Sequence, residues 1–218
     1  MSRSARRRLA QAATLAALIV PLAACGDDGE EASSGPIRPN VELAGVSGKT
    51  TAIKLDKGFV DALGSLGLTP GTVGDGRLAK GSLVFPITGG NVALYTPGEV
   101  SPYVVGQLQH EGSGLTLAAG GTTVRLSNFI VDPSISRVYG DVAVNGQTAV
   151  SNAYLFRLDG STLQPLETKG RFAILEGAEV YISEVAAPLL NDTFGTDAVT
   201  DELLVGVAKV TVNTKVAG

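Results

Sequence analysis

The first side chain that could do chemistry is the single histidine, His110. One histidine and one cysteine cannot supply a zinc site, which uses several His or Cys ligands. Ser113 follows three residues later, but it lacks the Gly-x-Ser-x-Gly setting that exposes a nucleophilic serine. A hydrolase would therefore need His110 itself as the base. We expect a structural or surface histidine and keep a ligand or catalytic role as the alternative.

Acidic residues form two further candidate groups. A calcium ion could be held by oxygen atoms of one acidic loop, formed by Asp192, Asp197, Asp201 and Glu202. This loop lacks the alternating acidic positions and central glycine of an EF-hand, so a solvated loop is expected and no metal site is predicted. Glu111 and Glu184 could be paired hydrolase carboxylates, but no pattern places them 5–10 Å apart.

Tyrosine is the remaining candidate ligand, because a phenolate can bind haem iron. The chain has Tyr95, Tyr103, Tyr139, Tyr154 and Tyr181. Strand tyrosines more often pack the ring and leave the hydroxyl in water. Tyr103 and His110 lie at the two ends of one predicted strand, and they are the candidate residues if the protein binds a ligand.

The N-terminal segment predicts export and lipid attachment. Four arginines precede an apolar stretch, Leu9 to Leu22, that is too short for a transmembrane helix and is typical of a secretory signal peptide. Leu22-Ala23-Ala24-Cys25 resembles the lipobox of bacterial lipoproteins, in which the cysteine thiol receives diacylglycerol. We predict a signal peptide over residues 1–24 and lipidation of Cys25. The alternative is an ordinary signal peptide with a chance cysteine.

Composition limits the partners of the mature chain. After residues 1–24 are removed, 13 basic residues remain against 21 acidic ones, a net charge of −8. Such a charge argues against nucleic acid, which binds cationic patches. Residues 26–39 are rich in Gly, Ser, Pro and acidic side chains, so we predict a flexible tether over residues 25–48. We expect a protein on the extracytoplasmic side of the cell membrane, with an unidentified extracellular ligand or protein as its partner.

Residues 49–214 are expected to form one β-rich domain. Short apolar or alternating runs separated by glycine-rich turns predict strands over 50–56, 82–88, 91–96, 103–110, 115–118, 122–131, 138–144, 147–158, 171–175, 180–182 and 204–212. Asn145-Gly146 and Asp159-Gly160 favour type I′ turns, and Gly112-Ser113-Gly114 predicts a bend between two strands. Helices are predicted after the N-cap Asp56 and over residues 183–194. The fold class is mainly β, an antiparallel β-sandwich or open barrel with two short helices.

The order of these segments resembles the HtaA domain of secreted and surface proteins, mostly from actinobacteria, several of which take up haem. The similarity runs through residues 53–66, Phe85-Pro86-Ile87-Thr88-Gly89-Gly90, residues 106–117, Leu126-Ser127-Asn128-Phe129 and residues 177–194. It implies the fold and, in haem-binding members, a tyrosine ligand in the first helix supported by histidine. Here residues 57–68 contain no tyrosine, and His110 is offset by about two strand positions.

These observations predict a non-enzymatic cell-envelope lipoprotein that uses a β scaffold for binding or adhesion, with no cofactor. Haem or metallophore binding in the manner of HtaA domains is the first alternative, and a hydrolase using His110 is the second.

Overall fold

The computed structural model describes residues 35–46 and 48–214. The architecture below is that of the compact unit that begins at Ile37. The predicted signal peptide and Cys25 lie outside the described residues. Within the described ranges, no helix is both long and apolar enough to span a bilayer.

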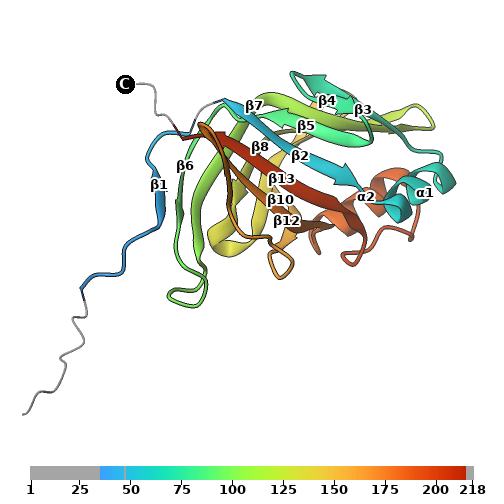
Figure 1. Ribbon diagram of the computed structural model, residues 1–218. Coiled ribbons are helices and arrows are strands. Elements are labelled where there is room, and N and C mark those ends of the chain that lie inside the picture. The colour runs from blue at the N-terminus through green and yellow to red at the C-terminus, as the bar shows by residue number, and fades with distance from the viewer. Residues whose placement is uncertain (1–34, 47, 215–218) are drawn as a thin grey trace, which may run out of the picture. The chain divides into compact units, whose positions relative to one another are not determined.

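Antiparallel strands of a single 13-stranded sheet make up most of this unit (Figure 1). The strands are β1 Val41–Leu43, β2 Lys49–Leu55, β3 Thr69–Gly74, β4 Arg77–Ala79, β5 Ser82–Pro86, β6 Gly89–Leu94, β7 Val104–Ala119, β8 Thr122–Asp132, β9 Arg137–Val144, β10 Gln147–Asp159, β11 Glu167–Lys169, β12 Phe172–Ile182 and β13 Leu204–Asn213. The helices are α1 Lys57–Ser65, the 3₁₀ helix η1 Pro133–Ile135 and α2 Ala186–Phe194. The mainly β prediction with two short α-helices is confirmed.

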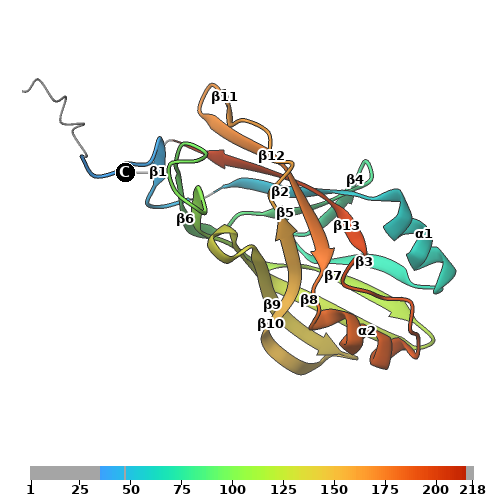
Figure 2. The same cartoon turned by 90° about the horizontal axis from the view of Figure 1, so that it is seen from below.

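The sheet curls into a half-barrel (Figure 2). Its strand order is β1-β6-β7-β8-β9-β10-β12-β13-β2-β5-β4, with β3 beside β7 and β11 beside β12. β5 and β6 follow each other closely, yet β5 pairs with β2 and β6 pairs with β7. Between them, the amide of Thr88 donates to the carbonyl of Gln109 at 2.8 Å. This short segment therefore links strands that are far apart in the sheet order.

Local sequence signals explain both helices. The predicted N-cap Asp56 is confirmed, since its carboxylate accepts hydrogen bonds from the amides of Gly58 at 2.7 Å and Phe59 at 3.3 Å. Before α2, the Ser183 hydroxyl accepts a bond from the amide of Ala186 at 2.9 Å. The helix ends at Phe194, and the φ of 64° at the following Gly195 suits a glycine cap.

The two predicted turns have different outcomes. Asn145 and Gly146 have φ angles of 50° and 83° between β9 and β10, which confirms the type I′ hairpin. β10 does end at Asp159, but a type I′ turn at Asp159-Gly160 is wrong. Asp159 Oδ1 instead accepts a bond from the amide of Ser161 at 2.8 Å, and seven residues separate the end of β10 from β11.

The predicted break at residues 112–114 is also wrong, because β7 runs continuously from Val104 to Ala119. The register against β8 shifts between His110 and Gly114, and Gly112 has a φ of 72°. The glycines therefore form a β-bulge that does not end the strand.

The segment predicted as a flexible tether, residues 25–48, contains a strand, because β1 pairs with β6 there. A three-residue strand is too short to show an alternating pattern.

Candidate functional site

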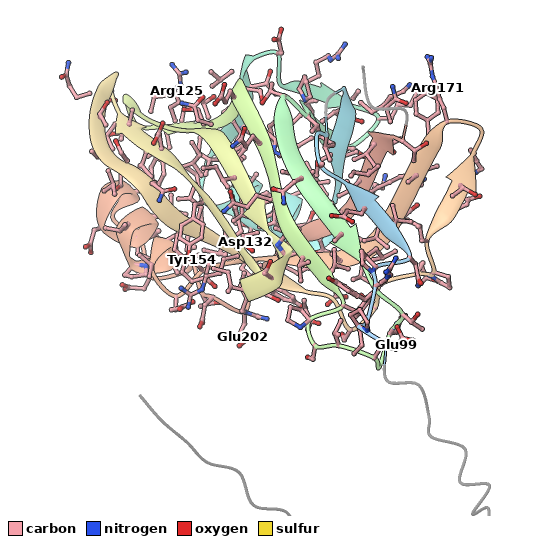
Figure 3. All side chains as sticks on the ribbon, turned by 90° about the vertical axis from the view of Figure 1, so that its left-hand side faces the viewer. Glu99, Arg125, Asp132, Tyr154, Arg171 and Glu202 are labelled. Atoms are coloured by element: carbon pink, nitrogen blue, oxygen red, sulfur yellow. The ribbon has the colours of Figure 1, made fainter. Side chains whose placement is uncertain are left out.

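An apolar cavity of about 170 Å³ lies inside the half-barrel. Inward-facing side chains of β1, β2, β5 to β10, β12 and β13 line it. Among the lining residues, only Thr51 and His110 carry a polar side-chain atom. Figure 3 shows the opposite pattern on the outside, where the labelled Glu99, Arg125 and Arg171 lie at the periphery of the sheet. The cavity wall is therefore apolar except at one position, where Thr51 and His110 lie.

The cavity lies where two apolar clusters of buried side chains meet. The larger cluster includes Phe85, Phe129 and Phe156, and the smaller one includes Leu43 and Leu108. All five of these residues line the cavity. Protein interiors are normally close-packed, and an unfilled cavity lowers stability. A cavity of this size is therefore a candidate binding site.

His110 and Thr51 form the polar position. The His110 side chain is 1% exposed and that of Thr51 is 5% exposed. His110 Nε2 and Thr51 Oγ1 are 2.8 Å apart and share a hydrogen bond. The second ring nitrogen, Nδ1, is buried, and no group of the described residues meets it with ideal hydrogen-bond geometry.

Burial also sets the charge of this ring. Desolvation lowers the pKa of His110 from 6.5 to about 4, while hydrogen bonding with the backbone of Phe129 acts in the opposite direction. The ring is therefore neutral at pH 7, with one nitrogen protonated and the other free to accept a hydrogen bond.

The residues considered for a hydrolase are not arranged as a relay. Ser113 is fully buried, and its hydroxyl donates to the main-chain carbonyl of His110 at 3.1 Å rather than to the ring. Glu111 lies exposed on β7, whereas Glu184 acts electrostatically on Arg137 and Tyr154. Among the described residues, no hydrogen bond or ion pair joins the two glutamates.

The acidic loop residues Asp192, Asp197, Asp201 and Glu202 are all exposed. Within residues 35–46 and 48–214, no three His, Cys, Asp or Glu side chains gather as a metal site would require.

None of the five tyrosines lines the cavity. Tyr103 is half-buried just before β7, and its carbonyl accepts a hydrogen bond from the amide of Tyr95. The structure thus places His110 on the cavity wall but does not bring Tyr103 to it. A role of Tyr103 in ligand binding remains a prediction.

Tyr139 and Tyr154 pack together on β9 and β10 with ring centroids 5.9 Å apart. The guanidinium of Arg137 lies 4.5 Å from the Tyr154 ring centroid. Arg157 lies 4.4 Å from the ring of Tyr181 in the same way. Contacts with charged side chains place these rings on the opposite face of the strands from the cavity, where tyrosine hydroxyls remain close to water.

Sequence reasoning did not identify Thr51 or the phenylalanines around His110. Phe85 and Phe129 have ring centroids 5.1 Å apart, and Phe129 and Phe156 are 6.2 Å apart, both pairs edge to face. Phe85 and His110 are 6.5 Å apart at an interplanar angle of 82°. The alternating pattern of the strands assigns these residues to the core, but nothing in the sequence indicates that they surround a space.

No family model and no curated protein matches this chain. Among solved structures, the C-terminal domain of HtaA from Corynebacterium glutamicum is similar, at 11% identity and a TM-score of 0.52, over 78% of this chain and 98% of that one. A domain-swapped dimer variant of the same domain aligns at 12% identity and a TM-score of 0.43, over 72% and 90%. At this identity the likeness is one of fold, and the chain has an HtaA-like fold.

Proposed function

We propose that this chain is a lipid-anchored, non-enzymatic binding protein on the outer side of a cell membrane, and that it holds a small apolar ligand inside the half-barrel. The anchor is supported by Cys25 in its lipobox-like setting and by the acidic segment that follows it. The observation that carries the binding function is the cavity, whose wall is apolar except at Thr51 and His110.

Size and polarity support a small apolar ligand. A protein cavity of about 150 Å³ lined by Leu, Ile and Phe stays dry and binds benzene or xenon. The present cavity, at about 170 Å³, has a similar size and a similar lining. Binding there gains the free energy of removing an apolar molecule from water.

Benzene titration of the full chain tests this function, with Cys25→Ser included to prevent lipidation. Calorimetry is expected to show saturable, one-to-one binding. Ala208→Leu should weaken it at least about tenfold, because Ala208 lines the cavity and the larger side chain fills part of the space. Ala52→Leu is the matched control, since Ala52 lies between two cavity-lining residues of the neighbouring strand and so faces away. Non-saturable binding in the parent protein would overturn the proposal.

Haem binding, which the resemblance to HtaA domains implies, does not fit these residues. A haem iron held by phenolate needs a tyrosine fixed by packing, and no tyrosine lines the cavity. The His110 nitrogen Nε2 is already bonded to Thr51. A haemin titration should therefore give only a weak, broad Soret change. A sharp stoichiometric band that is lost in His110→Ala would make haem binding the preferred function instead.

A further inference from the structure

Two pairs of like-charged side chains lie next to each other on the sheet, where β9, β10 and β12 are neighbours. Arg157 on β10 is directly opposite Arg137 on β9. Two residues further along β10, Asp159 is directly opposite Glu179 on β12. Side chains in directly opposite positions are close, and like charges there destabilise a sheet. The fold therefore keeps a basic pair and an acidic pair at a cost in stability.

All four charged side chains point away from the cavity. Successive residues of a strand face opposite sides of the sheet. Each of the four has a neighbour in its strand that lines the cavity: Val138, Phe156, Leu158 or Val180. Arg137 is exposed and the other three side chains are half-buried. Both pairs can therefore be reached by a partner on the outer face of the half-barrel.

Neither pair is neutralised within one copy of the domain. In the part of the chain that the structure describes, no ion pair includes any of the four residues. Opposite charges do act on each other at longer range, Glu184 on Arg137 and Arg157 on Asp159. Solvent weakens the interaction of such separated charges at a surface. The capacity of both pairs to form close ion pairs thus remains unused.

Tyrosine rings hold the two arginines in place. The guanidinium of Arg137 lies 4.5 Å from the ring centroid of Tyr154, and that of Arg157 lies 4.4 Å from the ring centroid of Tyr181. A guanidinium that packs on a ring can still donate through its N–H groups to a carboxylate. Tyrosine and arginine are enriched in protein–protein interfaces, and the exposed apolar Ile135 lies two residues before Arg137. The surface therefore has the composition of a protein interface.

We infer that this surface binds a second copy of the chain, and we define it as the charge patch Arg137, Arg157, Asp159 and Glu179. A two-fold axis brings the same patch of both copies together. The basic pair of each copy can then face the acidic pair of the other, so that both like-charged pairs gain opposite charges. A nucleic acid or an anionic membrane would leave the acidic pair facing negative charge, which favours a second copy as the partner.

Sedimentation equilibrium tests the inference on the full chain with Cys25→Ser, from about 1 μM to about 1 mM protein. The parent should show a reversible monomer–dimer equilibrium. The acidic variant, Arg137→Glu with Arg157→Glu, should dimerise at least about tenfold more weakly, because carboxylates then face carboxylates. Arg77→Glu with Arg125→Glu is the matched control, since it makes the same change in net charge on β4 and near the other end of β8. It should dimerise like the parent.

A second variant tests whether opposite pairs face each other. The basic variant, Asp159→Lys with Glu179→Lys, should also fail to dimerise by itself. Mixed with the acidic variant, it should form a one-to-one heterodimer, because every contact between the two patches then joins opposite charges. The basic variant should not bind the control variant as tightly. Circular dichroism spectra equal to that of the parent establish that each variant is folded, and either variant alone tests the patch if the other does not fold.

The contradicting outcomes are distinct. A parent that stays monomeric up to the highest concentration overturns the inference. A dimer that both patch variants leave intact, or that the control variant weakens equally, overturns it as well, because association then does not depend on the patch. Folded acidic and basic variants that form no heterodimer would show that the two pairs do not face each other. None of these results bears on ligand binding in the cavity.

Discussion

His110 Nε2 lies 2.8 Å from Oγ1 of Thr51, and this hydrogen bond joins β7 to β2 across the interior of the half-barrel. The two strands are not neighbours in the sheet order. The bond therefore ties together distant parts of one sheet at the point where the cavity has its only polar lining atoms.

The bond predicts coupling between the two side chains. Thr51→Val should lower the free energy of unfolding by about 1–3 kcal/mol, because it leaves Nε2 buried without a partner. His110→Phe should have a cost of similar size, since it leaves the Thr51 hydroxyl unpaired. The double variant leaves neither group of this hydrogen bond unpaired. Its loss of unfolding free energy should therefore be at least about 1 kcal/mol smaller than the summed losses of the two single variants. Urea unfolding of the four proteins measures this coupling, and additive costs would contradict it.

The buried ring also predicts a pH dependence. Burial lowers the pKa of His110 from 6.5 to about 4 in the folded protein, so the unfolded chain binds a proton at higher pH than the folded one. Stability from this group is therefore complete above pH 6.5 and is lost as the pH falls toward 4, by about 2–3 kcal/mol in all.

Comparison with His110→Phe separates this effect from the titration of carboxylates. Between pH 7.5 and 4.5 the free energy of unfolding should fall further in the parent than in the variant. Equal losses in the two proteins would mean that His110 titrates normally.

The β9–β10 turn makes a third prediction. Gly146 has a φ of 83°, and a Cβ built there meets no atom within 4 Å, so any cost of substitution is backbone strain. Gly146→Val should cost about 1–2 kcal/mol. Gly146→Asn is the matched control and should cost much less, because asparagine tolerates this region. Thermal unfolding distinguishes them, and equal melting temperatures would refute the assignment of the turn.

Anchoring gives a fourth prediction. Cys25→Ser should release the chain from membranes or leave an unprocessed precursor, because a serine hydroxyl cannot form the thioether. Growth with radiolabelled fatty acid, followed by membrane fractionation, measures this. Label that remains on the Cys25→Ser protein would contradict lipidation at this residue.

Signals that depend on neighbouring residues made parts of this fold predictable. Asp56 caps α1 through amides two and three residues away, and Asn145-Gly146 sets its own hairpin. The sequence does not predict β3, because this strand depends on pairing with the second half of β7, which is distant in the sequence. The sequence predicts a break where the structure has a bulge at residues 110–114, because glycines in a bulge and glycines in a loop look alike in sequence.

The candidate site was harder to predict for the same reason. His110 could be singled out by residue type alone, but its partner Thr51 is 59 residues away. The cavity depends on side chains from ten strands, and an unfilled volume has no sequence pattern. The sequence also suggested Tyr103 as a second ligand-binding residue, because it shares a predicted strand with His110.

The central claim is that a small apolar ligand occupies the interior of the half-barrel. The most direct measurement is anomalous diffraction from a crystal of the protein soaked with bromobenzene, whose bromine locates the ligand without prior assumptions. The account predicts one strong bromine peak within the cavity, beside Phe85, Phe129 and His110. Peaks confined to the outer surface, with the interior unchanged, would contradict it.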